Sequence, residues 1–146
     1  MTYMGQAIKE AMKAYRMGEV PVGAVIVKNR KIIGRGYNMV EAMNDPSLHA
    51  EIVAIREAAK KLGSWRLSGC TMYVSLEPCP MCAGALVEAR LDCLVYGARD
   101  EMKGCCGSLM DLTSEPSFNH KLESIYMEDR RASRILSLFF QELRQG

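Results

Sequence analysis

Short runs with strand composition alternate with helical segments along this chain, and this alternation constrains its fold more than any other feature. Helical spacing of apolar residues, together with Pro80 at a first helical position, predicts helices at residues 3–17, 49–62, 80–90 and 132–143. β-rich runs predict strands at residues 20–27, 32–37, 70–75, 91–96 and 122–126, the first two forming a hairpin. The alternation predicts an α/β fold, in which helices cover both faces of one sheet.

We expect a single domain spanning residues 1–146. Of the 146 residues, 49% are hydrophobic and 25% charged, which suffices for a core without disulfides and excludes a disordered chain. No apolar run approaches the ~20 residues that cross a bilayer, and the first residues lack a secretory signal. We therefore expect a cytoplasmic protein with no membrane partner. The net charge of +2 permits a nucleic-acid partner without indicating one.

Residues 98–120 are rich in Gly, Ser, Pro and Asp and are predicted to form a long loop with one helical turn. Loops of this length in compact domains usually carry function. We therefore expect a functional role for this segment.

The strongest chemical signal is Pro78-Cys79-Pro80-Met81-Cys82, a C-x-x-C pattern directly before a predicted helix. In a reducing compartment the six cysteines are thiols, metal ligands or catalysts rather than a disulfide framework. Two thiols three positions apart at a helix start can face one ion, and the positive helix N-terminus stabilises their thiolates. Zinc takes four protein ligands in a structural site, and three plus water in a catalytic one.

The remaining ligand candidate is His49, in the segment His49-Ala50-Glu51 at the start of another predicted helix. Residues two apart on a regular helix point roughly 160° away from each other, so both approach one ion only where the helix points at it end-on. His49, Cys79 and Cys82 would leave a fourth position open for water, with the Glu51 carboxylate to move its proton. The pattern H-x-E…P-C-x-x-C is typical of zinc nucleobase deaminases.

Two other interpretations of the cysteine pair stay open at this point. The pair also suits a thioredoxin-type redox centre, which leaves His49 and Glu51 without a role. A closed structural zinc site would take Glu51 or Cys70 as its fourth ligand. The other four cysteines are interpreted as packing residues, and the adjacent Phe139 and Phe140 as a core pair of which one points elsewhere.

Further segments match a known pattern. They are residues 19–25, 36–38, 45–46, 76–79, 97–100, 107–111, 119–120 and 139–140. Together with the zinc motif, they make nearly the whole chain resemble the bacterial tRNA-specific adenosine deaminases of the cytidine deaminase-like superfamily. The zinc motif is common to the superfamily, whereas residues 98–100, 119–120 and 139–140 match the tRNA-acting members. The resemblance implies a three-layer α/β/α cytidine deaminase-like fold with a mixed, roughly five-stranded sheet.

The resemblance also assigns roles to individual residues. One zinc ion per chain is bound by His49, Cys79 and Cys82, and the proton shuttle is Glu51. The purine is read by Asn38, in a pocket whose walls are Val22, Leu76 and Pro78. The splayed anticodon loop of tRNA is held by Asp100, Asn119 and Phe140. A homodimer without an organic cofactor is implied as well.

Two departures from the family pattern stand out. Where members commonly carry Lys-Thr after Arg-Asp-x, this chain has Met102 and Lys103, and where they carry two alanines before Gly-Ser it has Cys105 and Cys106. Both departures weaken the expectation of tight RNA binding and leave the zinc motif intact.

The resulting hypothesis is zinc-dependent hydrolytic deamination of adenosine to inosine at the wobble position, the first of the tRNA anticodon. One alternative is a deaminase of a free nucleobase, nucleoside or nucleotide, of the guanine or cytosine type, which would not need the surface from Asp100 to His120 or the last helix. A remote alternative is a non-catalytic zinc-containing RNA-binding protein, in which Glu51 would have no task.

Overall fold

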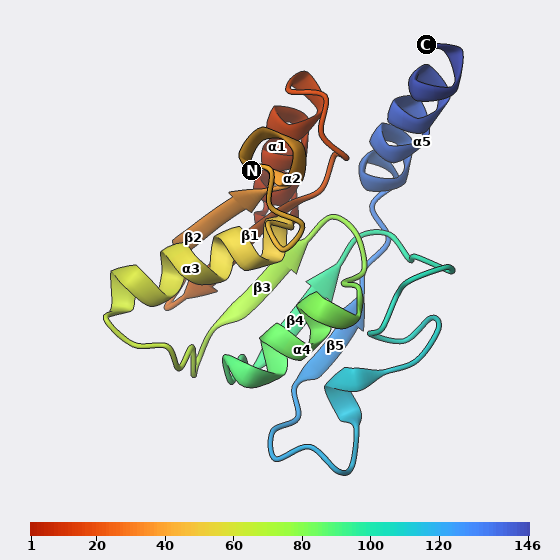
Figure 1. The fold of residues 1–146 in the computed structure, drawn as a ribbon. Coiled ribbons are helices and arrows are strands. Elements are labelled where there is room, and N and C mark those ends of the chain that lie inside the picture. The colour runs from red at the N-terminus through yellow and green to blue at the C-terminus, as the bar shows by residue number, and fades with distance from the viewer.

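The computed structural model describes all residues from 1 to 146 (Figure 1). The helices are α1 (Tyr3–Arg16), α2 (Val40–Met43), α3 (Ala50–Leu62), α4 (Pro80–Glu88) and α5 (Arg130–Gln145). The strands are β1 (Gly23–Lys28), β2 (Lys31–Tyr37), β3 (Thr71–Val74), β4 (Cys93–Tyr96) and β5 (Glu123–Tyr126). The long loop between β4 and β5 contains one short 3-10 helix, Leu112–Ser114. No helix is long and apolar enough to cross a bilayer.

The five strands form one mixed sheet in the order β2-β1-β3-β4-β5. β1 is antiparallel to both of its neighbours, whereas β3, β4 and β5 are parallel. α3 and α4 lie together on one side of the sheet (Figure 1), where Ala54, Ala58 and Leu86 pack into the main core. α1 and the start of α5 cover the opposite face through a second cluster that includes Ile8 and Ala132. The expected three-layer α/β/α fold with a mixed five-stranded sheet is confirmed.

The first strand begins later than expected. Residues 20–22 were expected within it, but the strand begins at Gly23. Pro21 has no N–H to donate to a sheet ladder, and the Val22 N–H donates locally to the Val20 carbonyl. Helix α2 was not expected, because four residues carry no periodic signal.

The last helix was correctly expected, but most of its apolar stripe is not core. Only Ala132 and Ile135 are buried, while Phe139 is half-buried and Phe140 is 40% exposed. The interpretation of Phe139 and Phe140 as a core pair is therefore wrong, because neither side chain is buried. The four packing cysteines are confirmed: Cys70, Cys105 and Cys106 belong to the main core, and Cys93 packs against the second cluster.

Glycines in the hairpin let helices approach both faces of the sheet. A Cβ at Gly23 would lie 2.1 Å from the Ala7 carbonyl oxygen of α1, and one at Gly36 would lie 2.3 Å from the Ala50 oxygen of α3. Because Ala50 is the first residue of α3, the contact with Gly36 fixes where that helix begins relative to the sheet.

Two buried carboxylates hold the loops that follow the strands. Glu19, 1% exposed, accepts hydrogen bonds from the backbone N–H groups of Glu41 and Ala42 at the start of α2. Glu77, 2% exposed, accepts from the backbone N–H groups of Asp100, Cys106 and Ser108 and from the Ser108 hydroxyl. Glu77 thereby holds the loop after β4 against the segment that carries the C-x-x-C pattern.

Replacing Gly36 by alanine should destabilise the chain by about 1–3 kcal/mol, because α3 must move away from β2. The measurement is the free energy of unfolding from urea denaturation. Gly84→Ala is the matched control, since nothing lies within 4 Å of a Cβ there and alanine favours a helix by about 0.5–1 kcal/mol. Equal stability of the G36A variant and the parent chain would contradict the close approach.

Replacing Glu77 by glutamine should lower the free energy of unfolding by about 2–3 kcal/mol, because an amide cannot accept all of the hydrogen bonds that the carboxylate accepts. Glu101→Gln, at an exposed position in the same loop, should change it by less than about 0.5 kcal/mol. Similar urea midpoints for the two variants would show that Glu77 does not anchor the loop.

Candidate active site

Two helix N-termini converge on one cluster of metal-ligand atoms. His49 is the N-cap of α3, Cys79 is the N-cap of α4, and Cys82 lies in the first turn of α4. The Nδ1 atom of His49 lies 3.5 Å from the Sγ atom of each cysteine. All three ligand atoms lie within 4.8 Å of one another. The structure thus brings together the three predicted ligands in a cluster that could hold a metal ion.

Local sequence explains why these residues stand at helix ends. Pro80 occupies the first position of α4 and biases the preceding residue toward extended backbone, as seen at Cys79 with φ −75° and ψ 176°. Before α3, Asp45 accepts hydrogen bonds from the backbone N–H and hydroxyl of Ser47, and the Ser47 carbonyl accepts from the His49 N–H. This turn leads the chain into α3 with His49 in extended backbone.

Hydrogen bonds within the cluster favour a thiolate. The Cys82 thiol donates to Cys79 and, with further help from His49, lowers the pKa of Cys79 to about 4. The hydrogen bond that the Cys82 thiol donates to Cys79, together with burial, raises the pKa of Cys82. The hydrogen bond with Cys79 raises the pKa of His49. A metal ion binds cysteine as the thiolate, and this arrangement favours the thiolate at Cys79.

Glu51 lies in the first turn of α3 and is only 3% exposed. Burial raises the pKa of its carboxyl to about 7, although the positive charge of His49 acts in the opposite sense. Neither Glu51 nor Cys70 belongs to the cluster of ligand atoms, so a closed four-ligand site finds no support in this geometry. A buried carboxyl beside the cluster can instead hold and release a proton near neutral pH.

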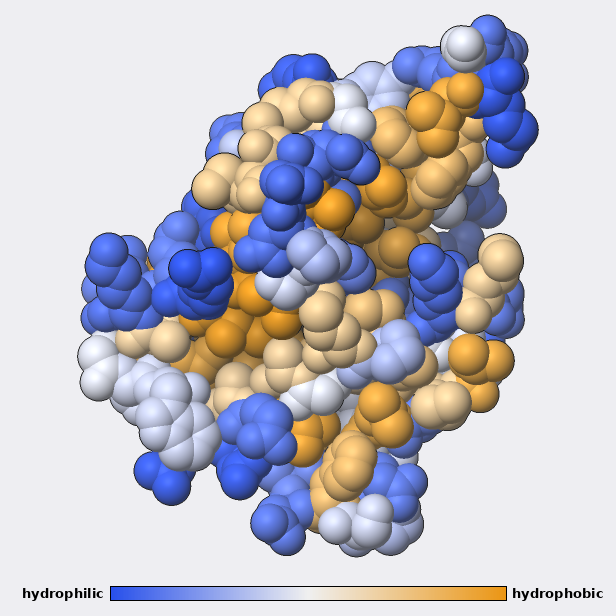
Figure 2. Space-filling model, in the orientation of Figure 1, coloured by the Kyte–Doolittle hydropathy of each residue, from blue (hydrophilic) through white to orange (hydrophobic).

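The cluster lies at a cleft of about 1040 Å³. Figure 2 shows apolar surface gathered in the hollow between α5 and the rest of the molecule. The apolar walls of the cleft come from the segment before β1, from the residues after β3 and from the apolar stripe of α5. They include Val20, Val22, Leu76, Leu136, Phe139, Phe140 and Leu143. The helical stripe that does not reach the core therefore forms one side of this cleft.

Asn38 lines the same cleft and carries the one buried side-chain polar atom without a hydrogen-bond partner, its Oδ1. The residue is 7% exposed, and its backbone N–H donates to the Val22 carbonyl. An unpaired buried acceptor costs about 1–3 kcal/mol. Such an atom points to a ligand that would donate a hydrogen bond to it.

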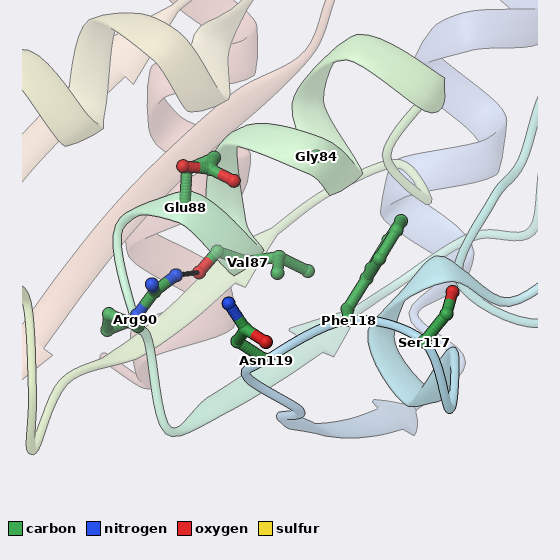
Figure 3. A pocket seen from close by; sticks show the side chains of 7 residues that line it. All are labelled: Gly84, Val87, Glu88, Arg90, Ser117, Phe118 and Asn119. Carbon is green, nitrogen blue, oxygen red and sulfur yellow. Dashed lines mark hydrogen bonds between the residues drawn. The ribbon is translucent and has the colours of Figure 1, made fainter.

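The other predicted site residues divide into two groups. Val22, Leu76, Asp100 and Phe140 line the cleft with Asn38, His49, Glu51 and Cys79. Pro78 is buried outside the lining, where its carbonyl accepts from the Cys105 N–H. Asn119 lies in a separate cavity of about 300 Å³, where it and Phe118 face Val87 of α4 (Figure 3). Within one chain, Asn119 is therefore not part of the cleft.

The contributors to the cleft that sequence reasoning missed include Arg99, Lys103 and Phe139. Lys103 stands one position later than the family lysine, yet it still lines the cleft. The signal for Phe139 was the apolar spacing at residues 136, 139, 140 and 143, which continues well beyond the part of α5 that meets the sheet.

Known proteins similar to this chain are deaminases. Residues 1–144 match the family model of the MafB19-like deaminases. The chain is 51% identical over 144 residues to the tRNA-specific adenosine deaminase of Bacillus subtilis, covering 98% of this chain and 89% of that protein. It is 43% identical to the tRNA-specific adenosine deaminase of Aquifex aeolicus, covering 99% and 95% of the two chains.

Solved structures of deaminases are similar to this chain as well. A structure from a study of A-to-I editing by tRNA:A34 deaminases at the wobble position has a TM-score of 0.82 and 41% identity, covering 86% of this chain and 96% of that one. A guanine deaminase from Bacillus subtilis has a TM-score of 0.66 and 34% identity, covering 99% and 92%. The chain belongs to the MafB19-like deaminase family and, within it, to the tRNA-specific adenosine deaminases.

Proposed function

We propose that this chain is a zinc-dependent enzyme that deaminates adenosine to inosine at the wobble position of tRNA. One observation carries the proposal: a His/Cys/Cys cluster and a buried Glu51 lie at a cleft that has an aromatic wall and an unpaired buried acceptor. The relatives named for tRNA adenosine deamination, at 51% and 43% identity, support this choice of substrate.

The three side chains fit a zinc ion. Zinc bonds of about 2.3 Å to sulfur and about 2.0–2.1 Å to nitrogen place tetrahedral N and S ligands about 3.6 Å apart. The two measured separations between His49 Nδ1 and the cysteine sulfurs are 3.5 Å. When bound, zinc would supply Lewis-acid activation of a water molecule. His49, Cys79 and Cys82 would hold it, which leaves one coordination position free.

The chain's own residues account for the proton transfers. Glu51 takes the proton of the attacking water, delivers a proton to N1 of the adenine and later assists the departure of ammonia. The balance is adenosine plus water giving inosine plus ammonia. Because ammonia leaves only after the amine has been protonated, a positioned acid is needed, and the buried Glu51 carboxyl supplies it.

The proposed roles of the cleft residues follow from their chemistry. The unpaired Asn38 Oδ1 would accept a hydrogen bond from the base. Val22 and Leu76 would contact its faces, and Phe140, 40% exposed on α5, offers a ring on which a neighbouring base can stack. Asp100 would contact the anticodon loop, and the buried Pro78 would support the pocket wall from outside the lining.

The size of the cleft favours a polynucleotide over a free base. Pockets for small molecules occupy about 300–1,000 Å³, and this cleft of about 1040 Å³ lies slightly above that range. Bases in an anticodon loop are unpaired, so turning one into a pocket costs less than in a duplex.

We also propose a homodimer in the cytoplasm. Phe118, 37% exposed, lines the cavity that holds Asn119. Met81, 40% exposed, lies on α4 three residues before Gly84, which also lines that cavity. A second copy covering this side would bury them and bring Asn119 into an interface.

Sedimentation should give the mass of two chains, whereas a monomer at micromolar concentration would contradict the dimer.

Replacing Glu51 by glutamine should leave zinc bound and reduce inosine formation by at least about 10²-fold, because the proton carrier is lost. The assay incubates the zinc-loaded chain with an arginine-tRNA anticodon stem-loop and, in parallel, with free adenosine, guanine and cytosine. Inosine in the RNA and released ammonia are measured, with zinc content determined for each variant. Glu57→Gln, at an exposed position on the same helix, is the control.

The outcomes of this assay separate the alternatives. Inosine in the stem-loop with slow turnover of the free compounds supports the tRNA substrate. Fast ammonia release from a free base with an unchanged stem-loop would favour the small-molecule deaminase. Bound zinc without ammonia from any substrate would favour a non-catalytic RNA-binding protein.

A further inference from the structure

The charges that line the cleft are mostly negative, which poses a problem for binding RNA. Its acidic residues are Glu19, Glu41, Glu51, Glu77, Asp100 and Glu101, whereas its cations are Arg99 and Lys103. Glu19 and Glu77 already accept hydrogen bonds from the protein backbone, as does Asp100 from the N–H groups of Met102 and Lys103. The polyanionic backbone of an RNA strand is therefore attracted to this surface by Arg99 and Lys103 alone.

Arg99 is held in place by a stack of aromatic rings. Its guanidinium carbon lies 4.6 Å from the ring centroid of Tyr126. Tyr126 in turn stacks on Tyr96, with centroids 5.4 Å apart and planes at 26°, and the Tyr96 hydroxyl donates to the Cys106 carbonyl. Tyr96 and Tyr126 are paired at the carboxyl ends of the parallel strands β4 and β5. The stack fixes the arginine without using its N–H donors.

The guanidinium donors of Arg99 have no partner within the chain. The side chain is exposed and forms no ion pair or hydrogen bond with another residue. Some other arginines are instead paired with carboxylates: Arg35 with Glu10, and Arg131 with Asp129. An arginine whose plane is fixed and whose donors are free is suited to a bidentate contact with a phosphate.

We propose that Arg99, supported by Tyr126, binds a backbone phosphate of the RNA strand next to the nucleotide in the cleft. This inference rests on the proposed function and names a contact within it. The site lies after β4, one strand away from the C-x-x-C segment that follows β3. Ligands of such sheets bind outside the carboxyl ends of the parallel β-strands. An RNA strand that enters the cleft therefore passes Arg99.

The chain contains a matched control. Arg66 lies over the ring of Trp65 at 4.5 Å, almost the same geometry as Arg99 over Tyr126. Arg66 does not line the cleft. Replacing each arginine by glutamine removes one charge and one cation–π contact in both cases, so only position relative to the cleft distinguishes the two variants.

The test measures binding of the anticodon stem-loop RNA to zinc-loaded chains that carry Glu51→Gln to prevent turnover. Added Arg99→Gln should raise the dissociation constant about tenfold at low salt. It should also reduce the slope of log affinity against log salt concentration by about 0.7, the value for one phosphate of a single strand. Added Arg66→Gln should change neither quantity, and Tyr126→Leu should weaken binding less than Arg99→Gln.

Several results would overturn the inference. They are equal affinity of the R99Q chain and its parent, a loss of affinity with an unchanged salt slope, and equal effects of R99Q and R66Q. Inosine formation by the chain with Glu51 intact tests the proposed function separately. If that chain forms no inosine while R99Q still lowers affinity and slope, the function fails and the phosphate contact stands.

Discussion

The meeting of two helix N-termini at one point is the constraint on which the rest of this structure depends. It places a histidine nitrogen and two sulfurs close enough to share one ion, and the N-terminal dipoles favour the thiolate that such an ion needs. It also places Glu51 in the first turn of α3, where burial raises the pKa of its carboxyl so that it can carry a proton. A change in the angle of α3 or α4 would move the Glu51 carboxyl and the histidine and cysteine ligands apart.

That convergence is supported by contacts that carry no chemistry themselves. Gly36 lets the start of α3 lie against the sheet, and Glu77 ties the segment leading to α4 to the loop after β4. The loop then contributes Arg99, Asp100 and Lys103 to the cleft. The metal-ligand segment before α4 and the loop that lines the cleft after β4 are thus neighbouring connections at one edge of the sheet. Because Glu77 joins them, this one buried carboxylate influences both.

Much of this was predictable from sequence because the signals are local. Helix starts at His49 and Pro80, and the spacing of Cys79 and Cys82, follow from nearby residues, and the structure places them as expected. Tertiary contacts were less accessible. The strand after Pro21 begins later than expected, α5 turns its phenylalanines to a cleft rather than a core, and Asn119 faces another cavity. Those outcomes depend on which helices, strands and loops contact one another in the folded chain. The spacing of residues along the sequence does not specify these contacts.

X-ray absorption at the zinc edge tests the central claim most directly, because it counts the atoms bound to the metal. For the zinc-loaded chain we expect two sulfurs at about 2.3 Å and two lighter atoms at about 2.0–2.1 Å, one of them from His49 and the other from solvent. The spectrum should be unchanged when Glu51 is replaced by glutamine. A third sulfur, or the loss of a light atom in that variant, would mean that the protein closes the fourth position and would contradict the account.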